Sequence, residues 1–255
     1  MEMKTSPVVL VLAVLLLSTT LAGCLEPDPD MDEVRVQEYH RTLQTTSQTS
    51  LVVRGINGGI NVVGWDGDNI SLTSVKVSYG GPSQLDRVEV SVTEGPDQIL
   101  VEERHHGRVR DVSVTLTLHV PRDLALQEVS TMNGDITLEG LSSVMTVSTY
   151  NGEIRLDNVR GSVEASTSNG GLKAVVSSLD GDMTLSSGNG GISVHLEPSM
   201  DADLTATTGN GWVSAHDLPL KTIYESTKRL DGRLGRGGHL IRCETSNGAV
   251  DLFPL

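Results

Sequence analysis

The sequence predicts an all-β fold, a β-solenoid-like stack of 18–21-residue coils that follows an antiparallel N-terminal portion. Three observations predict it. An Asn-Gly pair returns seven times, at Asn57, Asn133, Asn151, Asn169, Asn189, Asn210 and Asn247. Apolar and polar residues alternate on both sides of most copies, as they do along β-strands. Aromatic residues are scarce (one Phe, four Tyr and two Trp), so Val, Leu, Ile and Ala must form the core of a thin, strand-rich fold.

The repeat has a nearly fixed length. The central Asn residues are spaced by 18, 18, 20 and 21 residues, and the step to the last copy is 37. A period near 20 residues is typical of stacked repeats. Two residues before six of these Asn residues stands a hydroxyl, at Thr131, Thr149, Thr167, Ser187, Thr208 and Thr245. Four residues before them stand Val129, Val147, Ala165, Leu185, Ala206 and Cys243. We expect both sets to point into the core.

Each Asn-Gly pair is predicted to form a structural corner between two strands. The glycines of these corners are Gly58, Gly134, Gly152, Gly170, Gly190, Gly211 and Gly248. Asn and Gly suit a corner because both tolerate positive φ. Two architectures remain open, since an Asn-Gly pair between alternating arms also predicts a β-hairpin and an antiparallel meander. The recurrence of the same residue types at the same coil positions favours the solenoid.

The phrase Ser/Thr-x-Asn-Gly-x-Ile-x-Leu follows a strand that ends in Val-Pro, Val112 to Pro121. Together they resemble the putative-adhesin family of β-strand-repeat domains, whose biochemical function is unknown, over residues 45–255. The resemblance implies a right-handed, β-helix-like fold on a bacterial or archaeal cell surface. It implies no catalytic residues.

The N-terminus predicts a lipoprotein. Lys4 precedes an apolar run from Val8 to Leu17, which is shorter than the roughly 20 residues of a membrane-spanning helix and typical of a secretory signal. Leu21-Ala22-Gly23-Cys24 resembles a lipoprotein box. We therefore expect a signal peptide at 1–23, a lipid on Cys24, an acidic tether at 24–41, and a domain on the outer face of the cytoplasmic membrane. An uncleaved anchor and an ordinary secretory cleavage site are the alternatives.

Residues 42–128 are predicted to be the N-terminal antiparallel β portion. Val88–Val92 and Ile99–Glu103 flank a turn as a hairpin, and Val112–Val120 alternates strictly. We expect this portion to cap the first coil and to form one continuous domain with the Asn-Gly repeat at 129–255. A polar insert, Lys221–Gly238, is predicted to loop out before the last strands, with at most one short turn of helix.

Charge and candidate ligands exclude several functions. A net charge of −14 without a basic cluster argues against nucleic acid, whose phosphates need cationic contacts. His105-His106 has no further His or Cys at a ligand spacing, and we expect a solvated turn. Asp66, Asp68 and Asn69 lack the spacing of an EF-hand and leave room only for a weak cation site. We therefore expect no metal and no cofactor. Cys243 has no partner once Cys24 is lipidated, so we expect a buried free thiol.

Two functions fit the sequence. The first is a non-catalytic adhesion, binding or envelope-scaffold module, held to the membrane by its lipid and in contact with envelope proteins or surface glycans. Its candidate contact surface is Met132, Tyr150 and Trp212, which flank the corners on the outside. The alternative is a polysaccharide-active lyase or glycosidase that uses the outward residues Asp135, Glu153, Arg155 and Lys173. Charge pairing between coils on a solvated face explains those four residues equally well.

Overall fold

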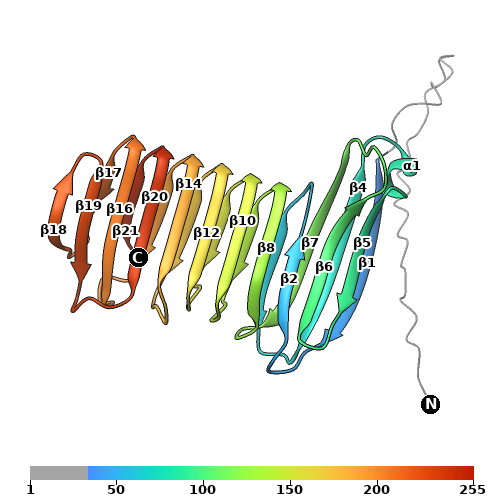
Figure 1. Ribbon diagram of the computed structural model, residues 1–255, viewed down its shortest axis with the longest axis horizontal. Helices are drawn as coiled ribbons and strands as arrows, with labels where there is room; N and C mark the ends of the chain where they lie inside the picture. Colours follow the sequence, from blue (N-terminus) through green and yellow to red (C-terminus); the bar gives the residue numbers. More distant parts are fainter. Residues whose placement is uncertain (1–33) are drawn as a thin grey trace, which may run out of the picture.

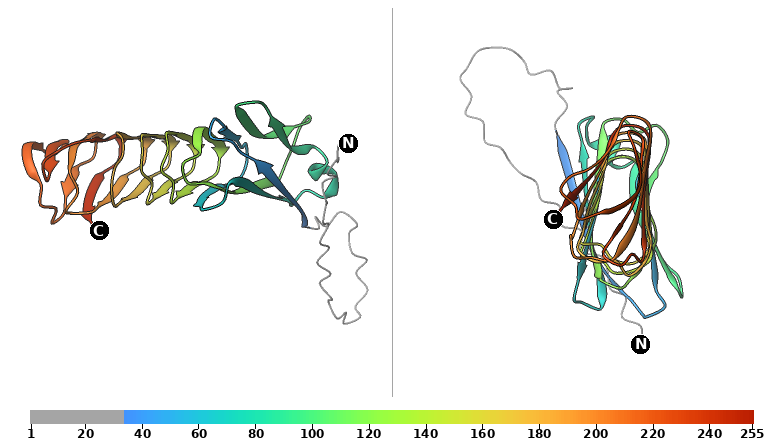
Figure 2. Two further views of the ribbon diagram at one scale, coloured as in Figure 1. Left: turned by 90° about the horizontal axis from the view of Figure 1, so that it is seen from below. Right: turned by 90° about the vertical axis from the view of Figure 1, so that its left-hand side faces the viewer.

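The computed structural model describes residues 34–255, which form a long stack of two facing β-sheets (Figures 1 and 2). The signal peptide, Cys24 and most of the predicted tether lie outside the described residues. One sheet has ten strands in the order β1-β4-β7-β3-β9-β11-β13-β15-β21-β17. The other has eleven, in the order β18-β19-β16-β20-β14-β12-β10-β8-β2-β6-β5. Within the described residues the only helix is α1 (Pro82–Leu85), a single turn that begins at the Gly80-Gly81 break.

The Asn-Gly repeat forms coils of two strands, one in each sheet. The strands before the corners are β8 (Ala125–Asn133), β10 (Met145–Asn151), β12 (Val163–Asn169), β14 (Met183–Asn189), β16 (Ala202–Asn210) and β20 (Leu240–Asn247). The strands after them are β9 (Ile136–Glu139), β11 (Ile154–Asp157), β13 (Leu172–Val176), β15 (Ile192–Leu196), β17 (Val213–Ala215) and β21 (Val250–Pro254). Neighbouring strands are parallel, with Val147 opposite Ala165 and Ala165 opposite Leu185. Parallel pairing confirms the stacked repeat, and the antiparallel meander is wrong for this region.

The core lies between the two sheets, as the alternation predicts. The aliphatic side chains four residues before each corner are at most 1% exposed, and the hydroxyl residues two before it are at most 7% exposed. On the other sheet Ile136, Ile154, Leu172 and Ile192 are also buried. Leu141 and Val159 fill the turn at the far end of the coil. Both strands of a coil therefore point their apolar residues at the same narrow interior.

The N-terminal portion is more mixed than predicted. It contains β1 (Arg35–Gln44), β2 (Ser50–Arg54), β3 (Ile60–Trp65), β4 (Asn69–Ser78), β5 (Val88–Glu94), β6 (Gln98–His105) and β7 (Val112–Pro121). The predicted hairpin is confirmed, since β5 pairs antiparallel with β6, and β4 pairs antiparallel with both β1 and β7. However, β6 runs parallel to β2, and β7 runs parallel to β3. Strands β6 and β7 therefore add one more coil to the stack, beside the coil of β2 and β3.

Two predicted segments need correction. Strand β1 begins at Arg35, so the tether predicted to reach residue 41 ends before it. The corner at Asn57 stacks directly on the corner at Asn133, so residues on both sides of position 129 belong to the same stack. The predicted loop at 221–238 holds an antiparallel hairpin, β18 (Lys221–Ser226) and β19 (Arg229–Leu234). Strand β19 forms because Leu230, Gly232 and Leu234 alternate inward and cover the end of the core.

The last coil is inserted out of sequence order. Strand β20 lies between β14 and β16, and β21 lies between β15 and β17 (Figure 1). After β17 the chain makes the hairpin β18–β19 and then returns to fill this place. The corner at Asn247 is therefore the neighbour of Asn189, and the corner at Asn210 is at the end of the row.

Candidate functional site

The corners line up along one side of the stack, which we call the Asn-Gly edge. Each Asn except Asn57, which only accepts, donates its Nδ2 to Oδ1 of the Asn in a neighbouring coil, at 2.8–3.0 Å. The ladder runs in the spatial order Asn57, Asn133, Asn151, Asn169, Asn189, Asn247 and Asn210. Neighbouring amides bond this closely because parallel in-register strands place identical side chains about 4.8 Å apart.

Buried hydroxyls fasten the same edge from the inside. Thr149 Oγ1 donates to the Gly134 carbonyl at 2.9 Å, and Thr167 Oγ1 donates to the Gly152 carbonyl at 3.0 Å. Ser187, Thr245, Thr208 and Thr131 repeat this bond to the glycine of the adjoining coil. A buried hydroxyl without a partner would cost stability, so the bond explains why a hydroxyl occupies an inward position.

Glycine is needed at each corner because adjoining coils approach closely there. A Cβ on Gly170, whose φ is 159°, would lie 1.9 Å from the Gly152 carbonyl oxygen. The same contact would measure 2.0 Å at Gly152 and 2.3 Å at Gly248. The neighbouring Gly171 is less restricted, since its Cβ would lie 3.3 Å from the nearest backbone atom.

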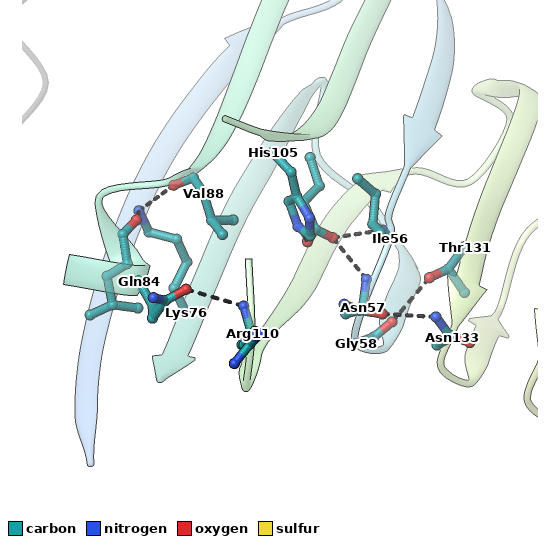
Figure 3. Close-up of polar contacts among 12 residues, drawn as sticks. Ile56, Asn57, Gly58, Lys76, Gln84, Val88, His105, Arg110, Thr131 and Asn133 are labelled. Carbon is teal, nitrogen blue, oxygen red and sulfur yellow. Dashed lines mark hydrogen bonds and ion pairs between the residues drawn. The ribbon is translucent and has the colours of Figure 1, made fainter. Parts of the chain in front are cut away.

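A buried carboxylate ends the ladder at the N-terminal portion (Figure 3). Glu103, only 3% exposed, accepts hydrogen bonds from the Ile56 N–H at 2.6 Å and the Asn57 N–H at 3.2 Å. His105 Nε2 lies 2.6 Å from its other oxygen, so His105 belongs to this cluster and not to the solvated turn that we predicted. His106 is exposed and lies beside Glu89. The cluster satisfies the backbone of the first corner, which explains why a carboxylate is buried here.

The three predicted contact residues are exposed on the Asn-Gly edge: Met132 at 56%, Tyr150 at 59% and Trp212 at 57%. Met132 and Tyr150 precede the corner Asn in adjacent coils, whereas Trp212 follows the corner glycine on the other sheet's side. If the coils stacked in sequence order, three strand steps would separate the corner beside Tyr150 from the corner beside Trp212. The inserted coil of Asn247 makes it four strand steps, about 19 Å.

The outward charges of the enzyme alternative lie in neighbouring coils, but each one has a partner. Lys173 Nζ lies 2.9 Å from Glu153, and Arg155 lies 3.2 Å from Asp157. Asp135 Oδ1 accepts the backbone N–H of Glu153 at 2.7 Å. The contacts of Lys173 and Asp135 with Glu153 connect neighbouring coils, as we expected for a solvated face, whereas Arg155 and Asp157 pair within strand β11.

In the candidate cation site of Asp66, Asp68 and Asn69, one carboxylate is already paired with an arginine. Arg122 Nε donates to Asp66 Oδ1 at 2.8 Å and already supplies a positive charge to that carboxylate. Among residues 34–255, no three His, Cys, Asp or Glu side chains are grouped so that they could hold a metal ion.

The same part of the chain contains no helix long and apolar enough to cross a membrane.

Several clefts could not be predicted from the sequence, and two of them are lined by basic side chains. One, of about 380 Å³, opens between β1, β4, α1 and β5. Burial lowers the pKa of Lys76 there, and its Nζ donates to the Val88 carbonyl at 2.9 Å (Figure 3). The lysine therefore links the two sheets at the N-terminal end. The other cleft, of about 320 Å³, lies on the side opposite the Asn-Gly edge, between the turns that hold Arg122, Ser142 and Arg160.

Cys243 is a free, buried thiol, as predicted, and occupies the core position that Leu185 and Ala206 hold in the adjoining coils. Burial raises the pKa of this thiol to about 12. The thiolate is the reactive form, so Cys243 is an inert core residue at neutral pH.

Comparison with known proteins agrees with this architecture. A putative cell adhesion protein from Clostridium sporogenes ATCC 15579 superimposes with a TM-score of 0.53 at 14% identity, over 87% of this chain and 100% of the other. A putative adhesin from Bacteroides fragilis NCTC 9343 is more distant, with a TM-score of 0.34 at 12% identity, over 86% of this chain and 97% of the other. Among curated proteins, none matches this chain.

The first of these likenesses shows a shared fold and no more. The model of the Toastrack DUF4097 family matches residues 42–252, which span both the N-terminal portion and every Asn-Gly corner. The chain therefore belongs to the Toastrack DUF4097 family.

Proposed function

We propose that this protein is a non-catalytic binding module of the cell surface, anchored to the outer face of the cytoplasmic membrane through a lipid on Cys24. Residues 1–23 are its signal peptide, and a short acidic tether leads to a single domain. The stack coils with the right-handed sense of its family, mostly with 18–21 residues per coil. It contacts envelope proteins or surface glycans through Met132, Tyr150 and Trp212.

The exposure of these three side chains on a rigid edge is the observation that supports this proposal. Each is more than half exposed, next to a corner that the ladder fixes in place. Tyr and Trp are favoured in interfaces because they combine a large apolar area with a polar tip and little conformational freedom. The Clostridium sporogenes structure with the same fold is described as a putative cell adhesion protein, which agrees with such a role.

The experiment uses the full chain in intact cells. The double variant Tyr150→Ser with Trp212→Ser should fold normally and lose most of the crosslinking to envelope partners or the binding on a glycan array. Val144→Ser is the matched control, because Val144 is 65% exposed but lies just before strand β10, away from the Asn-Gly edge. Equal binding by all three proteins would contradict the contact surface.

The anchor and the absence of catalysis have their own tests. Cys24→Ser should release the protein from membranes or leave an unprocessed precursor, and unchanged size and fractionation would contradict the lipid anchor. Incubation with uronic-acid polymers should produce no new reducing or unsaturated ends. Turnover that depends on Asp135 or Glu153 would favour the enzyme alternative instead.

A further inference from the structure

The cleft opposite the Asn-Gly edge has an unusual charge for this protein. Its lining comprises Arg122, Gly140, Leu141, Ser142, Asn158 and Arg160. Both charged residues of this lining are arginines, although the chain has 33 acidic and 19 basic residues. A positive cleft on a protein of net charge −14 needs an explanation of its own.

Three successive turns build the cleft. The Ser142 N–H donates to the Arg122 carbonyl at 2.7 Å, and the Arg160 N–H donates to the Leu141 carbonyl at 2.8 Å. Ser142 also forms a parallel bridge with Arg160. The two arginines are therefore two strand steps apart, about 10 Å between backbones, with Ser142 between them. This spacing leaves room for a small group between two long side chains.

The two guanidinium groups are in different states. Arg122 is held in place, since its Nε donates to Asp66 and its Nη1 donates to the Gly140 carbonyl at 2.9 Å, while its other terminal nitrogen has no partner among the described residues. Within residues 34–255 the Arg160 guanidinium makes no hydrogen bond or ion pair. Most other exposed arginines of the described residues are paired, for example Arg155 with Asp157 and Arg233 with Asp203, although Arg108 and Arg110 are not.

We propose that this cleft binds an oxyanion (a carboxylate, sulfate or phosphate group) between Arg122 and Arg160, with the Ser142 hydroxyl as a third donor. The planar guanidinium presents parallel N–H groups that match the oxygens of such anions. Ser142 Oγ is available because its contact with the Arg122 carbonyl is long, at 3.4 Å. Asp66 offsets much of the charge of Arg122, so Arg160 supplies the net positive charge of the site. The site lies apart from the proposed contact surface and does not depend on it.

The test titrates the folded protein at low ionic strength with sodium sulfate, inorganic phosphate and a glucuronate oligosaccharide, followed by NMR shifts of the Ser142 and Arg160 amides. A neutral oligosaccharide is the negative probe. Arg160→Gln should weaken binding of the charged probes at least tenfold. Arg160→Lys should weaken it less, because lysine keeps the positive charge but lacks the parallel N–H groups of the guanidinium. Tighter binding of the oligosaccharide than of the free ions would identify an acidic glycan as the source of the anion.

The matched control is Arg155→Gln, which removes the same charge from an exposed arginine that is already paired with Asp157. It should change the affinity less than twofold. An equal loss with both Gln variants would mean that only the overall charge matters and would overturn the site. So would the absence of binding to wild-type protein at millimolar concentrations of every charged probe. Unfolding midpoints of all variants should match wild type because these side chains are outside the core.

Discussion

Two groups of coils can be compared within this stack. The coils from β8 to β15 follow one another in sequence, whereas the coil of β20 and β21 is inserted between two coils that precede it. The ladder does not distinguish them. The amide bond from Asn169 to Asn151 measures 3.0 Å, and the bonds on the two sides of Asn247 measure 2.9 and 2.8 Å.

The similar bond lengths show that the residues of the corner determine how two coils contact each other. Whether the two coils are consecutive in the sequence does not matter. The Asn amide, the buried hydroxyl and the glycine together form an interface that any coil of the same kind can complete. Such nearest-neighbour stability is expected of stacked repeats, where each unit contacts only the adjoining ones. The comparison predicts that equivalent substitutions cost the same in both groups of coils.

The largest effect is expected from the corner glycines. Gly170→Ala in a consecutive coil and Gly248→Ala in the inserted coil would each place a Cβ 1.9–2.3 Å from a carbonyl oxygen of the adjoining coil. Relief of this clash must separate two coils, so we expect each variant to lose about 2–4 kcal/mol of unfolding free energy. Chemical denaturation measures the loss.

Gly171→Ala is the control for these variants. It adds the same methyl group one residue later, where the nearest backbone atom is 3.3 Å away. We expect it to cost less than about 1 kcal/mol. A large loss at Gly170 with a neutral effect at Gly248 would show that the inserted coil is loosely attached, and the comparison would fail.

A smaller effect over any one pH unit is expected from the thiol inside the inserted coil. The pKa of Cys243 is raised from 9.0 to about 12 in the folded state, so the unfolded chain loses its thiol proton first as the pH rises. This contribution to stability is complete below pH 9 and decreases by up to about 1.4 kcal/mol per pH unit from there to about pH 12.

The measurement compares wild type with Cys243→Ala, since alanine already occupies the equivalent core position at Ala165 and Ala206. Lysine and tyrosine titrate in the same range, and the difference between the two proteins removes their contribution. Wild type should lose more stability than the variant between pH 9 and 11. Parallel pH profiles, or rapid thiol labelling at pH 8, would mean that the inserted coil admits water.

Much of this stack was predictable from the sequence. Periodicity located the corners and the inward side chains, because each coil repeats the same residues at the same positions. The spatial order was not predictable, since a corner such as that at Asn247 fits beside any other and a step of 37 residues suits two arrangements. Strand β19 could have been recognised from the alternation of Leu230 and Leu234.

The candidate sites were harder to predict from the sequence than the fold. Glu103 is buried by a contact with Ile56 that only the folded chain creates. For the proposed oxyanion cleft, the sequence contains one usable signal, which is the spacing of its residues. Arg122, Ser142 and Arg160 follow one another at intervals of 20 and 18 residues, close to the repeat period. The exposed apolar residues were identifiable from alternation, but the distance between Tyr150 and Trp212 depended on the inserted coil.

The smallest graded effect is expected along the amide ladder. Asn169→Ala removes two amide–amide bonds, to Asn151 and from Asn189, and Asn247→Ala likewise removes two, together with a long contact of 3.5 Å to the Gly188 carbonyl. Asn210 is at the end of the row and takes part in one amide bond within the described residues, to Asn247. A hydrogen bond contributes about 0.5–1.5 kcal/mol net, and these amides are exposed, so the lower part of that range applies. We expect losses of about 1–2 kcal/mol for Asn169 and Asn247 and about half as much for Asn210, measured by denaturation. If position in the sequence decided the cost, Asn247 would resemble Asn210 instead, because both belong to the last two coils of the chain.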